Sequence, residues 1–147
     1  MAVELVDGYR WVLAVLIANV ALVGWMAKKV GGARRKFKVP YPIMYADEKE
    51  HKDAKIFNCV QRAHQNTLEL LPAFMAALLV GGLEFPRTAA ALGAIHFLAR
   101  IQYFKNYSVG DPSKRFAGGG RAVFPALSGL LLFSILSVVC QFVPQLY

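Results

Sequence analysis

Polar side chains recur at helical spacing inside an apolar stretch near the middle of the chain. Arg62, Asn66 and Glu69 follow one another at intervals of four and three residues, with Gln65 beside them. This spacing places them on one face of a helix. A charged group at mid-membrane costs roughly 3 kcal/mol on insertion scales, so these residues need a partner or a ligand.

A second polar set follows in the next apolar stretch. Its members stand at intervals of four, three and four residues and again share one helical face: His96, Arg100, Tyr103 and Tyr107. Together the two sets hold two guanidinium groups and one carboxylate. More basic residues stand in the polar segments that flank these stretches: Arg34, Arg35, Lys114 and Arg115.

This excess of positive charge predicts an anionic ligand. Guanidinium groups bind carboxylates in bidentate geometry, and tyrosines can line an apolar slot while donating hydrogen bonds. The residues therefore indicate a site for a small anionic, amphipathic molecule at the membrane surface, but they define no reaction. A structural interpretation stays open at this point: Arg62 would pair with Glu69 inside the bundle, and the two tyrosines would anchor the protein at the interface.

The composition indicates which elements position these faces. The chain has 56% hydrophobic and 12% aromatic residues and a mean hydropathy of +0.41, which is typical of a membrane protein. A chain of 147 residues normally forms one domain. We expect an all-α, integral membrane four-helix bundle, a single domain over residues 1–147, with spans at about 9–29, 57–83, 87–108 and 121–143.

The charge distribution predicts an orientation. Fifteen of the 17 Lys and Arg residues lie within 28–62 or 100–121. By the positive-inside rule, the segments between the first two spans and between the last two face the cytosol, and both termini face the lumen. Acidic Glu4 and Asp7 precede the first span, so it is no cleavable signal peptide. We expect the endoplasmic reticulum membrane as the default compartment.

Other classes of protein fit the sequence less well. The net charge of +8 could suggest nucleic acid, but the basic residues lie between apolar spans, so no nucleic-acid partner is expected. Cys59 and Cys140 lack the spacing of a zinc site and are too few for a disulfide framework. The three histidines are scattered, and we expect no metal.

The stretch from Arg62 to Glu69 reads Arg-Ala-His-Gln-Asn-Thr-Leu-Glu, with Pro72 shortly after it. It resembles the signature of the MAPEG family, the membrane-associated proteins of eicosanoid and glutathione metabolism. Further segments carry the same likeness over essentially the whole chain, and they are most similar to the type-three microsomal glutathione S-transferase branch: Phe37 to Tyr45, Phe57 to Cys59 and Asp111 to Arg115.

The resemblance implies a homotrimer of four-helix protomers with glutathione, the co-substrate, bound between neighbouring subunits. It implies two catalytic residues, Arg115 to stabilise the glutathione thiolate and Arg35 in a secondary part. It also implies a set of glutathione-binding residues: Arg34, Arg62, Asn66, Glu69, Arg100, Tyr103 and Tyr107. One residue departs from the leukotriene-forming pattern, because Leu70 stands where that member has a tyrosine, and one contact to glutathione is then missing.

The implied role of Arg115 agrees with thiol chemistry. A thiol with a pKa near 8.5 is only about a tenth ionised at pH 7.4, and the thiolate is the nucleophile. Lowering that pKa by about two units needs roughly 2.7 kcal/mol, which one desolvated guanidinium can supply. We expect Arg115 to lie just before the fourth span, where a helix N-terminus adds positive potential. The alternative is that Arg115, like Lys114, only anchors the protein at the membrane surface.

Three functions follow in order of support. The first is an enzyme that conjugates glutathione to lipophilic electrophiles or reduces lipid hydroperoxides with it, and leukotriene-forming conjugation belongs to the same chemistry. The second is a non-catalytic protein that binds and presents membrane lipid, although the family member of that kind lacks the full arginine set. The third, a transporter, lacks the inverted repeats and broken helices of that class.

Overall fold

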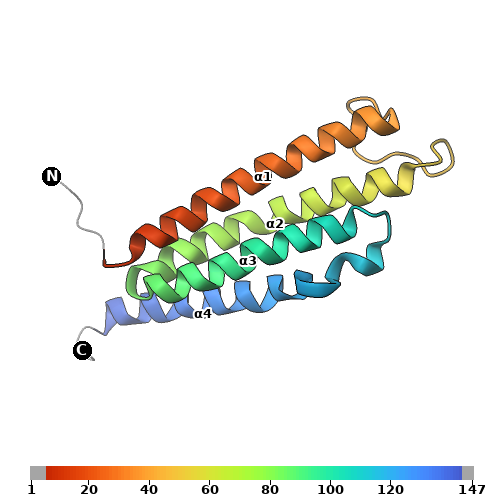
Figure 1. Ribbon diagram of the computed structural model, residues 1–147. Helices are drawn as coiled ribbons and strands as arrows, with labels where there is room; N and C mark the ends of the chain where they lie inside the picture. The colour runs from red at the N-terminus through yellow and green to blue at the C-terminus, as the bar shows by residue number, and fades with distance from the viewer. Residues whose placement is uncertain (1–5, 144–147) are drawn as a thin grey trace.

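The computed structural model describes residues 6–143, and Glu4 therefore lies outside the described part. The chain is all-helical, with four long helices side by side (Figure 1). Helices α2 and α3 each pack against both α1 and α4. The elements in chain order are α1 (Tyr9–Phe37), α2 (Ala54–Glu84), α3 (Pro86–Tyr107), the 3₁₀ helices η1 (Pro112–Phe116) and η2 (Gly118–Ala122), and α4 (Val123–Phe142).

Helix α1 is longer than the predicted span, which ended at about residue 29. It continues to Phe37 because its last turns hold basic residues, which are good helix formers and interact favourably with the carboxyl end of a helix. Lys38 then adopts the left-handed conformation and the amide of Val39 donates to the carbonyl of Arg34 at 3.0 Å. Arg34 and Arg35 therefore lie on a helix rather than in the loop after it.

Helices α2 and α3 meet at a tight corner. Pro86 occupies the first turn of α3, where its fixed φ suits a helix start. Gly82 lets the end of α2 approach α1 closely, because a Cβ there would lie 2.9 Å from a methyl carbon of Val12. Pro72 lies inside α2 without ending it. The 31 residues of α2 span about 46 Å, so the helix extends well beyond a hydrocarbon core of ~30 Å.

The connection from α3 to α4 differs from the prediction. The fourth span is expected to begin at about residue 121, whereas η1 and η2 occupy residues 112–116 and 118–122 and α4 begins at Val123. Glycines 118–120 favour this interruption, and Gly118 has a positive φ of 57°. Arg115 lies before the last apolar segment, as expected, but it belongs to η1, and η2 stands between it and the first residue of α4.

Three segments of the described chain are long and apolar enough to cross a membrane: 9–37, 54–84 and 118–142. Helix α3, expected as a further span, is not among them, because it carries Arg100 and other polar residues. Its 22 residues nevertheless cover about 33 Å alongside the other helices. The α1–α2 loop and the two 3₁₀ helices lie at the same end of the bundle (Figure 1), so both basic segments share that end. We call it the basic end.

The buried apolar residues form two clusters along the bundle. One lies toward the basic end and includes Met26, Phe57 and Phe104. The other lies toward the α2–α3 corner and includes Phe74 and Leu78. On α3 two polar residues, His96 and Arg100, are buried near the boundary of the two clusters, and this polar layer forms one edge of the candidate site.

Candidate functional site

The polar layer is centred on Arg100, whose side chain is among the most completely buried in the protein at 1% exposure. Its Nη1 donates to Oδ1 of Asn66 on α2 at 2.9 Å, and its Nε donates to Nε2 of His96 at 3.5 Å. The His96 ring stacks on Phe74 with 4.3 Å between centroids. Arg100 is thus enclosed within the protomer, and within residues 6–143 no acceptor pairs with its Nη2.

The face of α2 predicted from the sequence carries an ion pair at its edge. Arg62 Nη1 lies 2.6 Å from Glu69 Oε1, and each side chain is 43% exposed. The pair therefore lies at the surface, whereas the structural interpretation required it to lie inside the bundle. Tyr45 of the α1–α2 loop also interacts with Arg62. Exposed ion pairs contribute only about 0–1 kcal/mol to stability, so a charged ligand can exchange partners with this pair at low cost.

Aromatic rings join α3 to η1. Tyr103 packs edge-to-face against Tyr107 and lies tilted against Phe116, in both cases with 5.7 Å between centroids. The Arg115 guanidinium lies 4.6 Å from the centroid of Phe116 and 5.9 Å from that of Tyr107. The hydroxyl of Tyr103 is within electrostatic range of three guanidinium groups, those of Arg62, Arg100 and Arg115. Residues of α2, α3 and η1 thus converge on Tyr103. We call the following residues the Tyr103 group: Arg62, Asn66, Glu69, Arg100, Tyr103, Tyr107, Arg115 and Phe116.

Arg115 is held by backbone and rings rather than by a carboxylate. Its Nη1 donates to the carbonyl of Pro112. The nearby acidic residue, Asp111, instead accepts from the amide and hydroxyl of Ser113 at 3.0 and 2.7 Å and lies 4.0 Å from Lys114. The hydrogen bonds from Ser113 hold the pKa of Asp111 below its usual value. Over residues 6–143, Arg115 has no acidic partner, and its charge is available to a ligand.

A glycine of η2 packs closely against the backbone of Arg115. A Cβ at Gly120 would lie 2.7 Å from the Arg115 carbonyl oxygen and 3.5 Å from the Tyr103 backbone. Gly120 belongs to η2, so only glycine at this position lets η2 approach the Arg115 backbone of η1 this closely. The sequence shows a run of three glycines but does not indicate which of them has this packing role.

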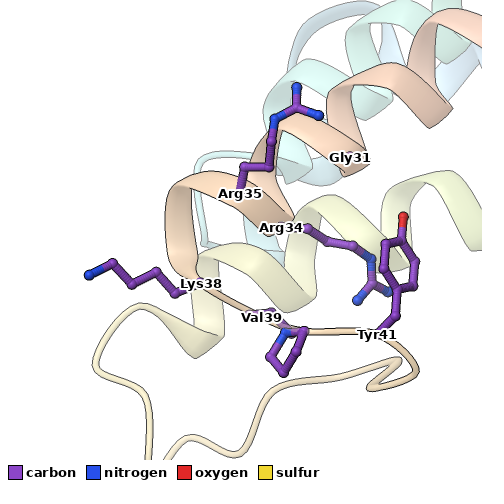
Figure 2. Close-up of a pocket in the computed structure, with 7 residues that line it drawn as sticks. Gly31, Arg34, Arg35, Lys38, Val39 and Tyr41 are labelled. Atoms are coloured by element: carbon purple, nitrogen blue, oxygen red, sulfur yellow. The ribbon is translucent and has the colours of Figure 1, made fainter.

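Arg34 belongs to a different environment on α1. Its side chain is only 7% exposed, with the guanidinium 4.5 Å from the Tyr41 ring and 5.1 Å from the Phe57 ring. Its Nη1 donates to the carbonyl of Ile43 at 2.7 Å. Arg34, Arg35 and Tyr41 border a cavity of about 380 Å³. Figure 2 shows the Arg34 guanidinium beside Tyr41, whereas the Arg35 side chain leaves the helix in another direction.

The predicted site residues therefore fall into two groups in one protomer. Within residues 6–143, no hydrogen bond, ion pair or ring contact joins Arg34 or Arg35 to the Tyr103 group. We call Arg34, Arg35 and the residues around their cavity the Arg34 group. A single protomer does not bring the nine predicted residues into one pocket.

The α1–α2 loop is tethered over the start of α2 by residues that were not among the predicted site residues. Asn58 pairs with both backbone groups of Ala46, accepting at 2.8 Å and donating at 2.9 Å. Gln61 donates to the sulfur of Met44 at 2.7 Å. These bonds position Tyr45 near Arg62 and Tyr41 near Arg34. No spacing signal identifies them, because the partners belong to an irregular loop.

In the part of the chain that the structure describes, no three His, Cys, Asp or Glu side chains gather where they could hold a metal ion. Cys59 is buried and unbridged. The arrangement supplies cationic and hydrogen-bonding groups. It is suited to holding an anionic molecule and stabilising negative charge.

Comparison with known proteins defines the class. Residues 12–136 match the MAPEG family, and the chain belongs to that family. It is 30% identical over 133 residues to microsomal glutathione S-transferase 2 of Homo sapiens, covering 90% of this chain and 84% of that protein, and 29% identical to the Mus musculus protein over the same shares. It is also 34% identical to leukotriene C4 synthase of Bos taurus over 99 residues, and this match spans 61% of that protein's length.

These findings confirm the family predicted from the sequence. They do not place the chain in the type-three branch, because the relatives named above are of the microsomal glutathione S-transferase 2 and leukotriene C4 synthase kinds.

Proposed function

We propose that the protein is a membrane-bound glutathione transferase that holds glutathione as a thiolate and delivers it to lipophilic electrophiles. The observation that carries this proposal is the guanidinium of Arg115, which is held in place by Pro112 and Phe116 and has no carboxylate partner within residues 6–143. The names of the relatives support the same chemistry, since they are a glutathione S-transferase and a synthase of leukotriene C4.

The Arg62–Glu69 pair supplies recognition of the peptide. Glutathione carries two carboxylates and one ammonium at neutral pH, and an exposed cation next to an exposed anion is complementary to its γ-glutamyl end. Binding replaces one intramolecular ion pair by two ion pairs to the ligand. Arg100 is enclosed, so it acts on glutathione by orienting Asn66, whose side chain it holds at 2.9 Å.

Arg115 supplies the chemical step. Tyr107 and Phe116 cover part of its guanidinium, and a charge partly shielded from water interacts more strongly with a thiolate sulfur. Keeping the sulfur ionised at neutral pH raises the concentration of the nucleophile about tenfold over a free thiol. The same thiolate can attack an electrophilic carbon or a peroxide oxygen, so conjugation, leukotriene-forming conjugation and hydroperoxide reduction share this site.

The separation of the Arg34 and Tyr103 groups supports a homotrimer. If glutathione binds between protomers, the Arg34 group of one copy completes the Tyr103 group of its neighbour. Cyclic symmetry then gives three equal sites, each built from two copies. Arg35, which lines the same cavity as Arg34 from another side of α1, is the second catalytic candidate in this arrangement.

The basic end is proposed to face the cytosol, with the endoplasmic reticulum as the membrane, because cytosolic loops carry the excess of Lys and Arg. This places the glutathione site on the side where basic residues of both connecting segments gather.

The test is an ultraviolet difference spectrum of the purified protein with glutathione. We expect a thiolate band at neutral pH that is lost on Arg115→Ala and retained on Lys114→Ala, the matched control from the same 3₁₀ helix. Absence of the band in the parent protein at saturating glutathione would contradict the proposal.

A further inference from the structure

A groove that the proposed glutathione site does not use runs between α1 and α3. Two apolar cavities of about 400 and 480 Å³ lie along it, and both are lined by Ala18 and Phe97. Small residues form much of the floor, including Ala14 and Ala21 on α1 and Ala94 on α3. The two cavities are therefore successive parts of one channel open to the surface of the bundle, which is apolar except for Lys105 at the 480 Å³ cavity.

The groove continues into a cationic cavity at the basic end. Trp25 lines both the second apolar cavity and a further cavity of about 670 Å³. Three lysines line that further cavity, Lys28, Lys29 and Lys36, and none of the residues around it is acidic. Within residues 6–143 none of the three forms an ion pair. The Lys29 ammonium lies 5.5 Å from the centroid of the Trp25 ring, at the junction of the two cavities.

The dimensions of the groove match a lipid. From Trp11 to Trp25 the α1 helix rises about 21 Å, which is more than half of a hydrocarbon core of ~30 Å. The apolar part can thus accept one acyl chain from the membrane surface to beyond the bilayer centre. Trp25 lies at the transition to the lysines, which is the usual position of a tryptophan at the membrane interface.

We propose that this groove binds one anionic phospholipid, with an acyl chain against Ala18 and Phe97 and the phosphate among Lys28, Lys29 and Lys36. Unpaired cations next to a long apolar channel complement an anionic headgroup attached to a chain. A zwitterionic lipid would leave part of that charge uncompensated. The proposal is independent of glutathione, because none of these residues belongs to the Tyr103 group or the Arg34 group.

Native mass spectrometry of the full-length protein released from detergent tests the headgroup. The probes are dioleoyl phosphatidylserine and dioleoyl phosphatidylcholine, which have the same chains. We expect phosphatidylserine to bind in preference to phosphatidylcholine. Its affinity should fall roughly tenfold or more when Lys28, Lys29 and Lys36 are all changed to Gln, because each lysine near an anionic headgroup raises the binding affinity several-fold. The control variant changes Lys49, Lys52 and Lys55 to Gln, which removes equal charge from the same end of the bundle, and it should bind as the parent does.

A second variant tests the chain. Ala18→Trp fills the point where the two apolar cavities meet, so it should weaken binding of the dioleoyl lipid several-fold with all lysines in place. Soluble glycerophosphoserine should fail to displace the lipid. Equal phosphatidylserine binding by the two lysine variants, equal affinity for both lipids, or displacement by glycerophosphoserine would overturn the proposal. If Ala18→Trp does not fold, the comparison of the two lysine variants decides.

Discussion

The Nη1 of Arg100 donates to Oδ1 of Asn66 at 2.9 Å, and this bond links the polar faces of α2 and α3. Arg100 is 1% exposed, whereas Asn66 is only partly buried. A guanidinium in such an enclosed position contacts a ligand through the residue it holds. We therefore propose that Arg100 positions Asn66, a role that the helical spacing alone does not reveal.

A double-mutant cycle separates the two roles of Arg100. Arg100→Lys keeps the charge but cannot bridge Asn66 and His96 with a planar fork, and Asn66→Ala removes the amide. Each should weaken glutathione binding by about 1.5–3 kcal/mol, the usual worth of a hydrogen bond to a charged group. If Arg100 acts through Asn66, the double variant should bind no worse than either single one. Calorimetry checks this, and additive losses would show that Arg100 contacts glutathione itself.

Arg62→Ala distinguishes a ligand-binding pair from a structural one. Because the side chains of Arg62 and Glu69 are each 43% exposed, loss of their ion pair in Arg62→Ala should change the free energy of unfolding by less than about 1 kcal/mol. Glutathione affinity should instead fall by about 2–3 kcal/mol, since a ligand carboxylate would be left without its partner. Thermal unfolding and calorimetry on the same preparation give both values. Unchanged affinity with reduced stability would support a purely structural pair.

The two separated groups make a prediction about assembly. Detergent-corrected mass should give a trimer, and Arg34→Ala and Arg115→Ala should each lose most of the parent activity at neutral pH when assembled alone. Co-assembly of the two variants in equal amounts should restore about a quarter of the parent activity. A site is then complete only when the copy that supplies Arg34 carries Arg115→Ala and the copy that supplies Arg115 carries Arg34→Ala. If both residues serve their own protomer, mixing should restore nothing.

Gly120 offers a test of how closely Arg115 must be placed. A Cβ at Gly120 would lie 2.7 Å from the Arg115 carbonyl oxygen, so Gly120→Ala should push η1 and η2 apart and displace Arg115. Turnover should fall about tenfold or more, because misplacement of a reacting group by about 1 Å has large effects on rate. Gly119→Ala is the matched control, since its Cβ would meet only the Gln102 side chain, at 3.8 Å. Equal turnover by both variants would contradict this account of the packing.

The sequence predicted the repetitive parts of the fold well and the irregular parts poorly. Arg62, Asn66 and Glu69 share a face of α2 because helical spacing alone determines it. The end of α1 was misplaced because hydropathy falls at Lys28, whereas the helix ends only where Lys38 adopts the left-handed conformation, before Pro40. A fall in hydropathy marks where a helix leaves an apolar environment and does not mark where its hydrogen bonding ends.

The candidate site shows the same division. The residue types indicated an anionic ligand, but the part that each arginine can play in binding it depends on contacts between helices and loops. The enclosure of Arg34 between Tyr41 and Phe57 arises from a loop whose path no periodicity predicts. The position of Arg115 on η1 likewise depends on the glycine run that interrupts the approach to α4.

The last prediction separates binding from chemistry at Arg115. Its guanidinium is held by Pro112 and Phe116 and has no acidic partner within residues 6–143, so its charge should act mostly on the glutathione sulfur. Arg115→Ala should spare glutathione affinity and raise the pKa of the bound thiol by about one to two units. Because the thiol form then dominates at neutral pH, turnover should fall about ten- to a hundredfold and recover in part as the pH rises. Arg115→Lys should restore some activity, since a point charge also stabilises a thiolate.

Thiolate titration by absorbance, run beside steady-state kinetics, measures the pKa of the bound thiol and the turnover of Arg115→Ala, with Lys114→Ala as control. A normal titration and normal turnover for Arg115→Ala would reduce Arg115 to a membrane anchor and make Arg35 the next residue to test.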